Sequence, residues 1–157
     1  MTQLQVGDTI ADFSLSATSE QTITSEHLKG QNTVIYFYPK DSTPGCTTEG
    51  LDFSALYDQF KALNTEVYGV SRDSIRAHEN FKAKQSFPFE LISDPDETLC
   101  KIFDVIKLKK MYGREYLGVE RSTFLINEQG ELVAEWRKVK VKGHAQAVLD
   151  AVKESQE

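Results

Sequence analysis

The run from Asn32 to Tyr38, NTVIYFY, constrains the fold more than any other stretch of this sequence. Its residues are almost all β-branched or aromatic, without the polar–apolar alternation of a strand that has one face in water. The run therefore predicts a strand buried on both faces, at the centre of a sheet covered on both sides. A chain of 157 residues fits one domain, so we expect residues 1–157 to form a single domain around this strand.

The rest of the chain alternates helix-like and strand-like patterns. After a hairpin over 13–24 and the central strand, the expected elements follow in this order: a helix over 48–63, a strand over 66–71, a helix over 74–84, a strand over 87–93, a helix starting at Asp94-Pro-Asp-Glu, a hairpin of strands over 121–127 and 131–136, and a helix over 143–154. Residues 104–120 show no clear period and are expected to form a loop. This order predicts an α/β fold, in which a central mixed β-sheet is flanked by helices and preceded by an N-terminal β-hairpin.

Charge and hydropathy exclude two classes of protein. The net charge of −6 and the pI near 5.1 argue against nucleic-acid binding, which needs clustered cations. The basic run 137–142, which alternates with Val139 and Val141, is interpreted as the solvated face of a strand. The first residues lack the pattern of a signal peptide, and no run approaches the ~18 apolar residues of a membrane span. A cytoplasmic protein without a membrane partner is expected.

The two cysteines, Cys46 and Cys100, are too few for a disulfide framework. Cys46 follows a Pro-Gly turn and starts a helix that leaves the central strand. In open α/β sheets, ligand sites gather at the C-terminal ends of the strands, where this helix begins. The N-terminus of a helix also favours a negative charge, which for a cysteine is the thiolate. We therefore expect a reactive thiol there in preference to a buried, inert one. Cys100, between Leu99 and Ile102, is expected to be a packed, inert thiol.

Thiolate formation alone does not make a fast enzyme. A free thiol of pKa about 8.5 is about 3% ionised at pH 7, and a pKa of about 6 would raise this only about 30-fold. A fast thiol enzyme also needs donors where charge develops in the transition state, so an arginine should lie near the sulfur.

Other kinds of site find little support in the sequence. His27, His78 and His144 have no metal-site spacing around either cysteine, and we interpret each as a surface or core-edge residue, so no metal is expected. No Gly-rich phosphate loop is present, so no cofactor is expected. Glu49 stands where a Cys-x-x-Cys motif would need its second cysteine, which weakens a disulfide-oxidoreductase interpretation.

The stretch from Tyr38 to Glu49, YPKDSTPGCTTE, closely resembles the active-site signature of peroxiredoxins, Pro-x-x-x-Thr-x-x-Cys, with Pro39, Thr43 and Cys46 in the motif positions. The sequence of this stretch is similar to that of the peroxiredoxin Q, or bacterioferritin comigratory protein, branch. The similarity covers nearly the whole chain, because three further stretches fall in the expected order: VGDTIADFSL (6–15), SDPD (93–96) and GVERSTFLI (118–126).

The resemblance implies a thioredoxin-like fold and a mostly monomeric enzyme. It also implies reduction of hydrogen peroxide and alkyl hydroperoxides by Cys46 as the peroxidatic cysteine, which passes through a sulfenic acid. By the family pattern, Thr43 hydrogen-bonds the sulfur and the peroxide, and Pro39 shields the site from water. Arg121 is then the cation that stabilises the thiolate and polarises the O–O bond.

The chain departs from this branch at the resolving cysteine. One position used by relatives, five residues after Cys46, holds Leu51, and the other falls in Phe81-Lys82-Ala83. Use of Cys100 would require a helix to unwind until the Cα atoms come within about 7 Å. We therefore favour a one-cysteine cycle with an external thiol, from glutathione, glutaredoxin or thioredoxin, over Cys100 as the resolving residue.

A second class of function uses the same cysteine. A peroxide-sensing redox switch or holdase would change a binding surface when Cys46 is oxidised, and would stall after about one turnover. A thioredoxin-fold disulfide oxidoreductase is the weakest of the three hypotheses.

Overall fold

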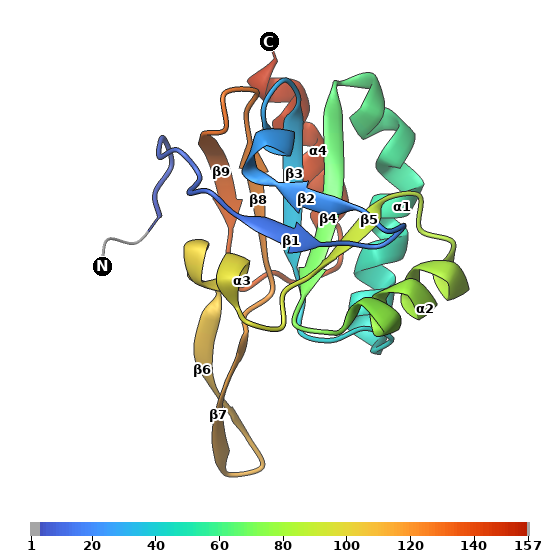
Figure 1. Ribbon diagram of the computed structural model, residues 1–157, viewed down its shortest axis with the longest axis vertical. Coiled ribbons are helices and arrows are strands. Elements are labelled where there is room, and N and C mark those ends of the chain that lie inside the picture. Colours follow the sequence, from blue (N-terminus) through green and yellow to red (C-terminus); the bar gives the residue numbers. More distant parts are fainter. Residues whose placement is uncertain (1–3, 157) are drawn as a thin grey trace.

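The computed structural model describes residues 4–156, so residues 1–3 and 157 of the expected single domain lie outside the described part. The centre is a five-stranded sheet in the order β5-β4-β3-β8-β9 (Figure 1). The elements are β1 (Ser14–Ser16), β2 (Thr22–Thr24), η1 (Ser25–Leu28), β3 (Asn32–Phe37), α1 (Pro44–Ala62), β4 (Thr65–Ser71), α2 (Ile75–Gln85), β5 (Glu90–Ser93), α3 (Thr98–Ile102), β6 (Ile106–Met111), β7 (Arg114–Val119), β8 (Ser122–Ile126), β9 (Leu132–Trp136) and α4 (His144–Ser155).

The central position of β3 is confirmed. β3 pairs in parallel with β4 and antiparallel with β8, and its residues 33–37 are all buried. β5 continues the parallel half and β9 the antiparallel half, so the sheet is mixed, as predicted. The predicted N-terminal hairpin is β1–β2, which pairs antiparallel.

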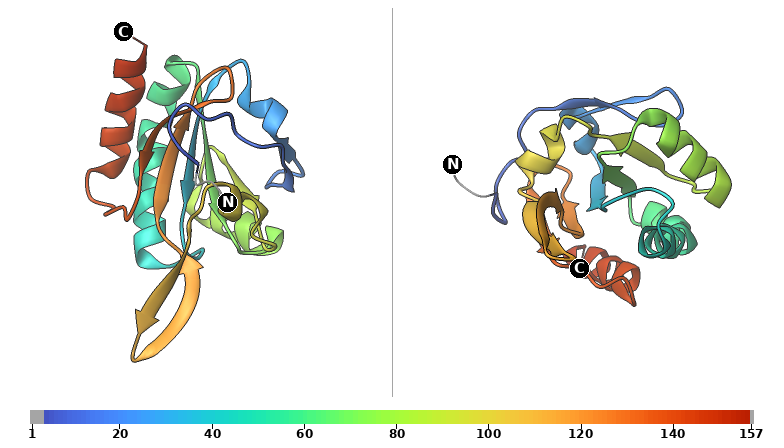
Figure 2. Two further views of the ribbon diagram at one scale, coloured as in Figure 1. Left: turned by 90° about the vertical axis from the view of Figure 1, so that its left-hand side faces the viewer. Right: turned by 90° about the horizontal axis from the view of Figure 1, so that it is seen from below.

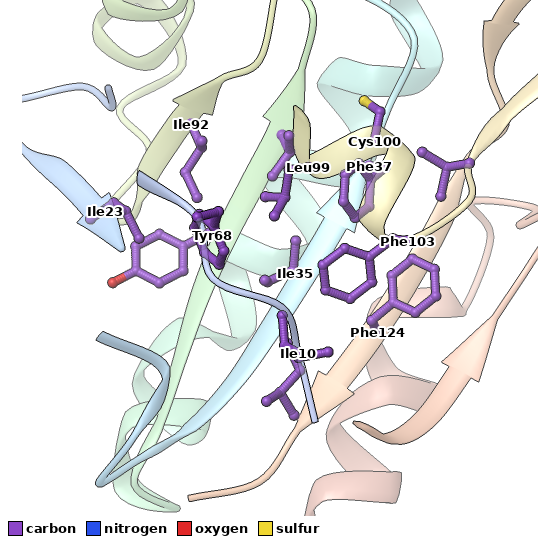
Figure 3. Close-up of a cluster of buried hydrophobic side chains, with 14 of the residues drawn as sticks. Ile10, Ile23, Ile35, Phe37, Tyr68, Ile92, Leu99, Cys100, Phe103 and Phe124 are labelled. Carbon is purple, nitrogen blue, oxygen red and sulfur yellow. The ribbon is translucent and has the colours of Figure 1, made fainter. Parts of the chain in front are cut away.

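Two separate hydrophobic cores lie on the two faces of this sheet. One contains Phe53 and Phe60 of α1 with Val148 and Leu149 of α4, and Figure 2 shows these two helices together on one side of the sheet. The other core packs β2 and α3 against the opposite face; Figure 3 shows Ile23, Leu99 and Phe103 in it, beside Ile35 and Phe124 of the sheet. No helix within residues 4–156 is long and apolar enough to span a membrane.

The expectation of a loop over 104–120 is wrong. β6 and β7 form a two-stranded hairpin that projects from the body of the molecule (Figure 1). Its turn residues Tyr112 and Gly113 have φ of 52° and 77°, the positive values that a two-residue type I′ hairpin turn requires. Most of the hairpin is in contact with water on both faces, so the sequence lacks the alternation that identifies a half-buried strand.

The predicted start of a helix at Asp94 is also wrong by several residues. α3 begins at Thr98, after Glu97 in the left-handed conformation (φ 63°). Asp94 still acts on this helix, because its carboxylate accepts a hydrogen bond of 2.8 Å from the backbone N–H of Cys100. Asp94 therefore caps α3 as an N-cap side chain would, although Glu97 occupies the N-cap position.

The basic run 137–142 is not a strand, because β9 ends at Trp136. Its first residue, Arg137, is half-buried and donates hydrogen bonds to the carbonyl oxygens of Phe103 (2.9 Å) and Asp104 (2.8 Å). The guanidinium also lies 5.1 Å from the ring centroid of Phe124. Arg137 therefore fastens the end of α3 to the sheet, a role that alternation with valines does not reveal.

Candidate active site

Cys46 lies at the third residue of α1, at the carboxyl end of β3. Thr43 is the N-cap and Pro44 the first helical residue, a position where the missing N–H of proline costs nothing. The backbone N–H groups of the first turn have no partner within the helix and favour negative charge. The side chain of Cys46 is only 2% exposed, so the predicted reactive thiol is nevertheless buried.

Arg121 is the arginine that the sequence predicted beside the sulfur. It immediately precedes β8, the neighbour of β3, and its Nη2 lies 3.4 Å from Cys46 Sγ. Its Nη1 donates to Oε1 of Glu49 at 2.6 Å. Cys46 and Glu49 are three residues apart on α1 and share one face of the helix, so one guanidinium bridges both. Burial opposes the charge of Arg121, but Glu49 and Cys46 outweigh it and raise the pKa of the guanidinium.

Gly45 makes room for this contact. A Cβ atom at that position would lie 3.2 Å from Arg121 Nη2, closer than most real Cβ contacts. The glycine of the Pro-Gly turn therefore lets the guanidinium lie against the first turn of α1.

Glu49 is a second buried partner of Arg121, whereas the sequence analysis noted it only as the residue that stands in place of the second cysteine of a Cys-x-x-Cys motif. It is 1% exposed, and burial raises the pKa of its carboxyl to about 7 although Arg121 acts in the opposite direction. Within residues 4–156 its Oε2 has no hydrogen-bond partner. The spacing Cys46-x-x-Glu49 could have identified it as a second partner for the arginine.

Thr43 and Pro39 flank the cysteine in the loop between β3 and α1, and both are half-buried. The hydroxyl of Thr43 donates to the carbonyl oxygen of Lys40 at 2.8 Å. No hydrogen bond joins this hydroxyl to Cys46 Sγ in the part of the chain that the structure describes. Thr47, a further hydroxyl near the sulfur, donates to the carbonyl of Thr43 at 2.8 Å.

Cys100 is buried, as expected, and both cysteines are free thiols. Burial, and next the nearby carboxylate of Asp94, raise the pKa of the Cys100 thiol far above its ordinary range. Cys100 belongs to the core that contains α3, whereas Cys46 belongs to the core that contains α1 and α4. The two sulfurs are therefore packed into cores on opposite faces of the sheet.

A buried polar group lies under the loop before Cys46, and the sequence analysis missed it. His78 is fully buried, so its interpretation as a surface or core-edge residue is wrong. Ligand atoms of Asp41, Asp73 and His78 lie within 4.8 Å of one another, a grouping that could in principle hold a metal ion. Both oxygens of Asp41, both ring nitrogens of His78 and Oδ2 of Asp73 already have hydrogen-bond partners in the protein. A metal ion would have to replace these bonds.

Two known proteins with similar sequences are peroxiredoxins. A Xanthomonas campestris pv. campestris protein, peroxiredoxin Bcp, is 59% identical over 141 residues, which cover 90% of this chain and 87% of the relative. Peroxiredoxin Bcp of Bacillus subtilis is 46% identical over 154 residues, 98% of each chain. The profile of the AhpC/TSA family matches residues 6–135. The chain is a peroxiredoxin of the AhpC/TSA family.

Solved peroxiredoxin structures share its fold. A cysteine-to-serine mutant of Xylella fastidiosa PrxQ superposes with a TM-score of 0.94 at 46% identity, with each chain covered completely (100%). A structure of the Xanthomonas campestris bacterioferritin comigratory protein, from work on its alkyl peroxide reduction activity, has a TM-score of 0.91 at 53% identity over 98% of both chains. The predicted family branch, thioredoxin-like fold and thiol peroxidase class are confirmed.

Proposed function

We propose that Cys46 is the peroxidatic cysteine of this peroxiredoxin and that its substrates are hydrogen peroxide and alkyl hydroperoxides. The observation that carries the proposal is the 3.4 Å contact between Arg121 Nη2 and Cys46 Sγ at the N-terminus of α1. The alkyl peroxide activity of the Xanthomonas campestris relative supports the substrate class.

In the first step, the Cys46 thiolate attacks the terminal oxygen of the hydroperoxide. An S–O bond forms, the O–O bond breaks, and the leaving alkoxide or hydroxide takes a proton to become alcohol or water. Cys46 is oxidised to sulfenic acid while the peroxide is reduced. Arg121 touches the sulfur and stabilises the negative charge as it moves onto the oxygens, and Glu49 orients the guanidinium.

Thr43 and Pro39 are proposed to shape the pocket for the peroxide. Since the Thr43 hydroxyl donates its hydrogen to Lys40, its lone pairs remain free to accept a hydrogen bond from the peroxide. Pro39 has no backbone N–H, so it covers the site without adding a competing donor.

The sulfenic acid is proposed to react with an external thiol, which releases water and forms a mixed disulfide. A second thiol then frees Cys46 and leaves as the oxidised disulfide product. The opposite-face packing of Cys100 supports this cycle, as does the absence of a cysteine at the two alternative positions, Leu51 and Phe81-Lys82-Ala83. Thioredoxin, glutaredoxin and glutathione are the candidate reductants. Two free thiols agree with a reducing compartment such as the cytoplasm.

Steady-state peroxide consumption tests the proposal, with tert-butyl hydroperoxide as substrate and either thioredoxin or glutathione as reductant. Cys46→Ser should abolish turnover, and Cys100→Ser should keep the wild-type rate. Loss of turnover in Cys100→Ser, with Cys46 still oxidised by peroxide, would assign Cys100 as the resolving residue. Arrest of the wild-type protein after one turnover with every thiol would instead indicate a peroxide sensor.

A further inference from the structure

Asp41 is the anchor of the segment that carries the active site. Its backbone N–H donates to Asp73 Oδ2 at 2.9 Å, and its Oδ1 accepts a hydrogen bond of 2.6 Å from the Tyr38 hydroxyl. Its Oδ2 lies 2.6 Å from His78 Nδ1. Within the described chain, no other residue of 39–45 forms a hydrogen bond to a group outside this segment and α1.

The bond between Asp41 and His78 holds a proton. Nε2 of His78 lies 2.9 Å from the carbonyl oxygen of Ile92, which can only accept, so Nε2 carries a hydrogen. With its only hydrogen on Nε2, a neutral imidazole has none at Nδ1, and an ionised carboxylate has none to donate. The hydrogen bond between Nδ1 and Asp41 Oδ2 therefore requires one more proton, shared between these two atoms. His78 is 0% and Asp41 8% exposed. A charge-assisted hydrogen bond is stronger than one between neutral groups. Its loss leaves Oδ2 of the buried Asp41 without this partner.

The partners of Asp41 belong to the rigid body of the protein. His78 projects from α2 and is itself held by the carbonyl oxygen of Ile92 in β5, and Asp73 is held by the Ser71 hydroxyl at the end of β4. The sequence separates His78 from Asp41 by 37 residues. The pair therefore fixes the start of the Cys46 segment to a part of the fold that does not take part in the chemistry.

The two half-reactions require opposite states of that segment. Attack on a small peroxide uses the closed arrangement, in which Arg121 contacts the sulfur. A thiol on a protein or peptide cannot reach a sulfur that is 2% exposed, so the first turn of α1 has to open before reduction. Any bond that holds the segment closed favours the first half-reaction and opposes the second.

We propose that the Asp41–His78 pair is a latch that sets this balance, with His78 as a positioning residue for Cys46. The latch presupposes the external-thiol cycle proposed above. It keeps the Cys46 turn closed for oxidation, and its opening admits the reducing thiol.

Two substitutions of His78 that each keep one of its two hydrogen bonds, together with one substitution of Asp41, test the latch. The side-chain amide nitrogen of glutamine corresponds to Nε2 of histidine, and that of asparagine to Nδ1. His78→Gln therefore keeps the bond to Ile92 and loses the bond to Asp41, whereas His78→Asn does the reverse. Asp41→Asn restores a neutral pair, because its amide can donate to Nδ1 and its oxygen still accepts from Tyr38. Exposed His27→Gln is the control.

Stopped-flow kinetics should measure the two half-reactions separately, oxidation by tert-butyl hydroperoxide and reduction of the oxidised protein by reduced thioredoxin. In His78→Gln we expect oxidation to slow about tenfold or more, the effect of one unpaired buried acceptor, while reduction is unchanged or faster. His78→Asn, Asp41→Asn and His27→Gln should stay within about threefold of wild type in both steps. Thermal unfolding should show that all four variants are folded.

Two results would overturn the latch. Equal oxidation rates in His78→Gln and His78→Asn would show that the bond to Asp41 is not needed, and a parallel loss in both half-reactions would indicate a structural role only. If His78→Gln does not fold, Tyr38→Phe, which removes one donor to Asp41, makes the same comparison of the two rates. The proposed function fails separately, if Cys46→Ser is still oxidised with the wild-type rate.

Discussion

Arg121 divides its guanidinium between the sulfur and a carboxylate, and the two contacts use different nitrogens. A lysine has one charged nitrogen and no planar fork, so it cannot hold both partners in the same geometry. Arg121→Lys should lower the rate constant for Cys46 oxidation about 100-fold, the usual effect of removing one transition-state donor. Stopped-flow oxidation with hydrogen peroxide measures this. A loss below about threefold would mean that a positive charge alone is sufficient.

Glu49 should make the stability of the protein depend on pH. Burial raises the pKa of this carboxyl from 4.5 to about 7, so the folded state binds the proton more tightly than the unfolded state. Its stabilising contribution is complete below about pH 4.5 and is lost as the pH rises through about 7. Relative to wild type, Glu49→Gln should therefore gain on the order of 3 kcal/mol in unfolding free energy between pH 4.5 and pH 8.

Urea unfolding at several pH values measures this difference. Glu115→Gln, on the exposed hairpin, is the matched control and should show no such gain. If the unfolding free energies of wild type and Glu49→Gln changed in parallel with pH, the pKa of the buried carboxyl would not be raised.

Single residues differed in how far the sequence could reveal them. Cys46 and Arg121 belong to motifs, and the need for a donor beside the sulfur, beyond what the helix N-terminus supplies, predicted a nearby arginine. Asp41 and His78 could not be paired in advance, because their contact depends on how α2 packs against the loop after β3. The burial of Cys46 was missed because polar neighbours in sequence say little about what the fold places over them.

Among the elements, α1 places Cys46 beside Arg121 at its first turn and packs against Phe87 at its second turn, and one glycine lies at each of these contacts. A Cβ at Gly50 would come within 2.9 Å of Phe87 Cε1, and one at Gly45 would lie 3.2 Å from Arg121 Nη2. Gly50→Ala should destabilise the protein by about 1–3 kcal/mol, although alanine favours a helix. Gly45→Ala should instead slow Cys46 oxidation several-fold and change stability by less than about 1 kcal/mol.

Thermal unfolding and stopped-flow oxidation of both variants make the comparison. If Gly50→Ala were as stable as wild type, Phe87 would not be packed over that glycine. If Gly45→Ala reacted at the wild-type rate, the approach of Arg121 to the first turn would not depend on glycine.

The elements were predictable where one physical signal dominates. β3 is a continuous apolar run because both its faces are buried, and α4 has apolar residues at helical spacing because one face meets the core. The β6–β7 hairpin carries no such signal, since its strands pair with each other through the backbone and most of their side chains are not buried. α3 begins late because Asp94 caps it from a distance, through the N–H of Cys100.

For the whole molecule, the sheet keeps the two thiols apart. Cys46 and Cys100 lie in cores on opposite faces, and each is buried. A disulfide between them would require one of these cores to open. The order of elements predicted the mixed sheet, but it could not show which face each cysteine would occupy, because this depends on how α1 and α3 pack.

The central claim is that Cys46 is oxidised to a sulfenic acid that awaits a thiol from outside. The most direct measurement is the intact mass and peptide map of the reduced protein after one equivalent of tert-butyl hydroperoxide in the presence of dimedone. The account predicts one dimedone adduct, on the peptide that contains Cys46. Loss of two hydrogen atoms without an adduct, as in a Cys46–Cys100 disulfide, or an adduct on Cys100, would contradict it.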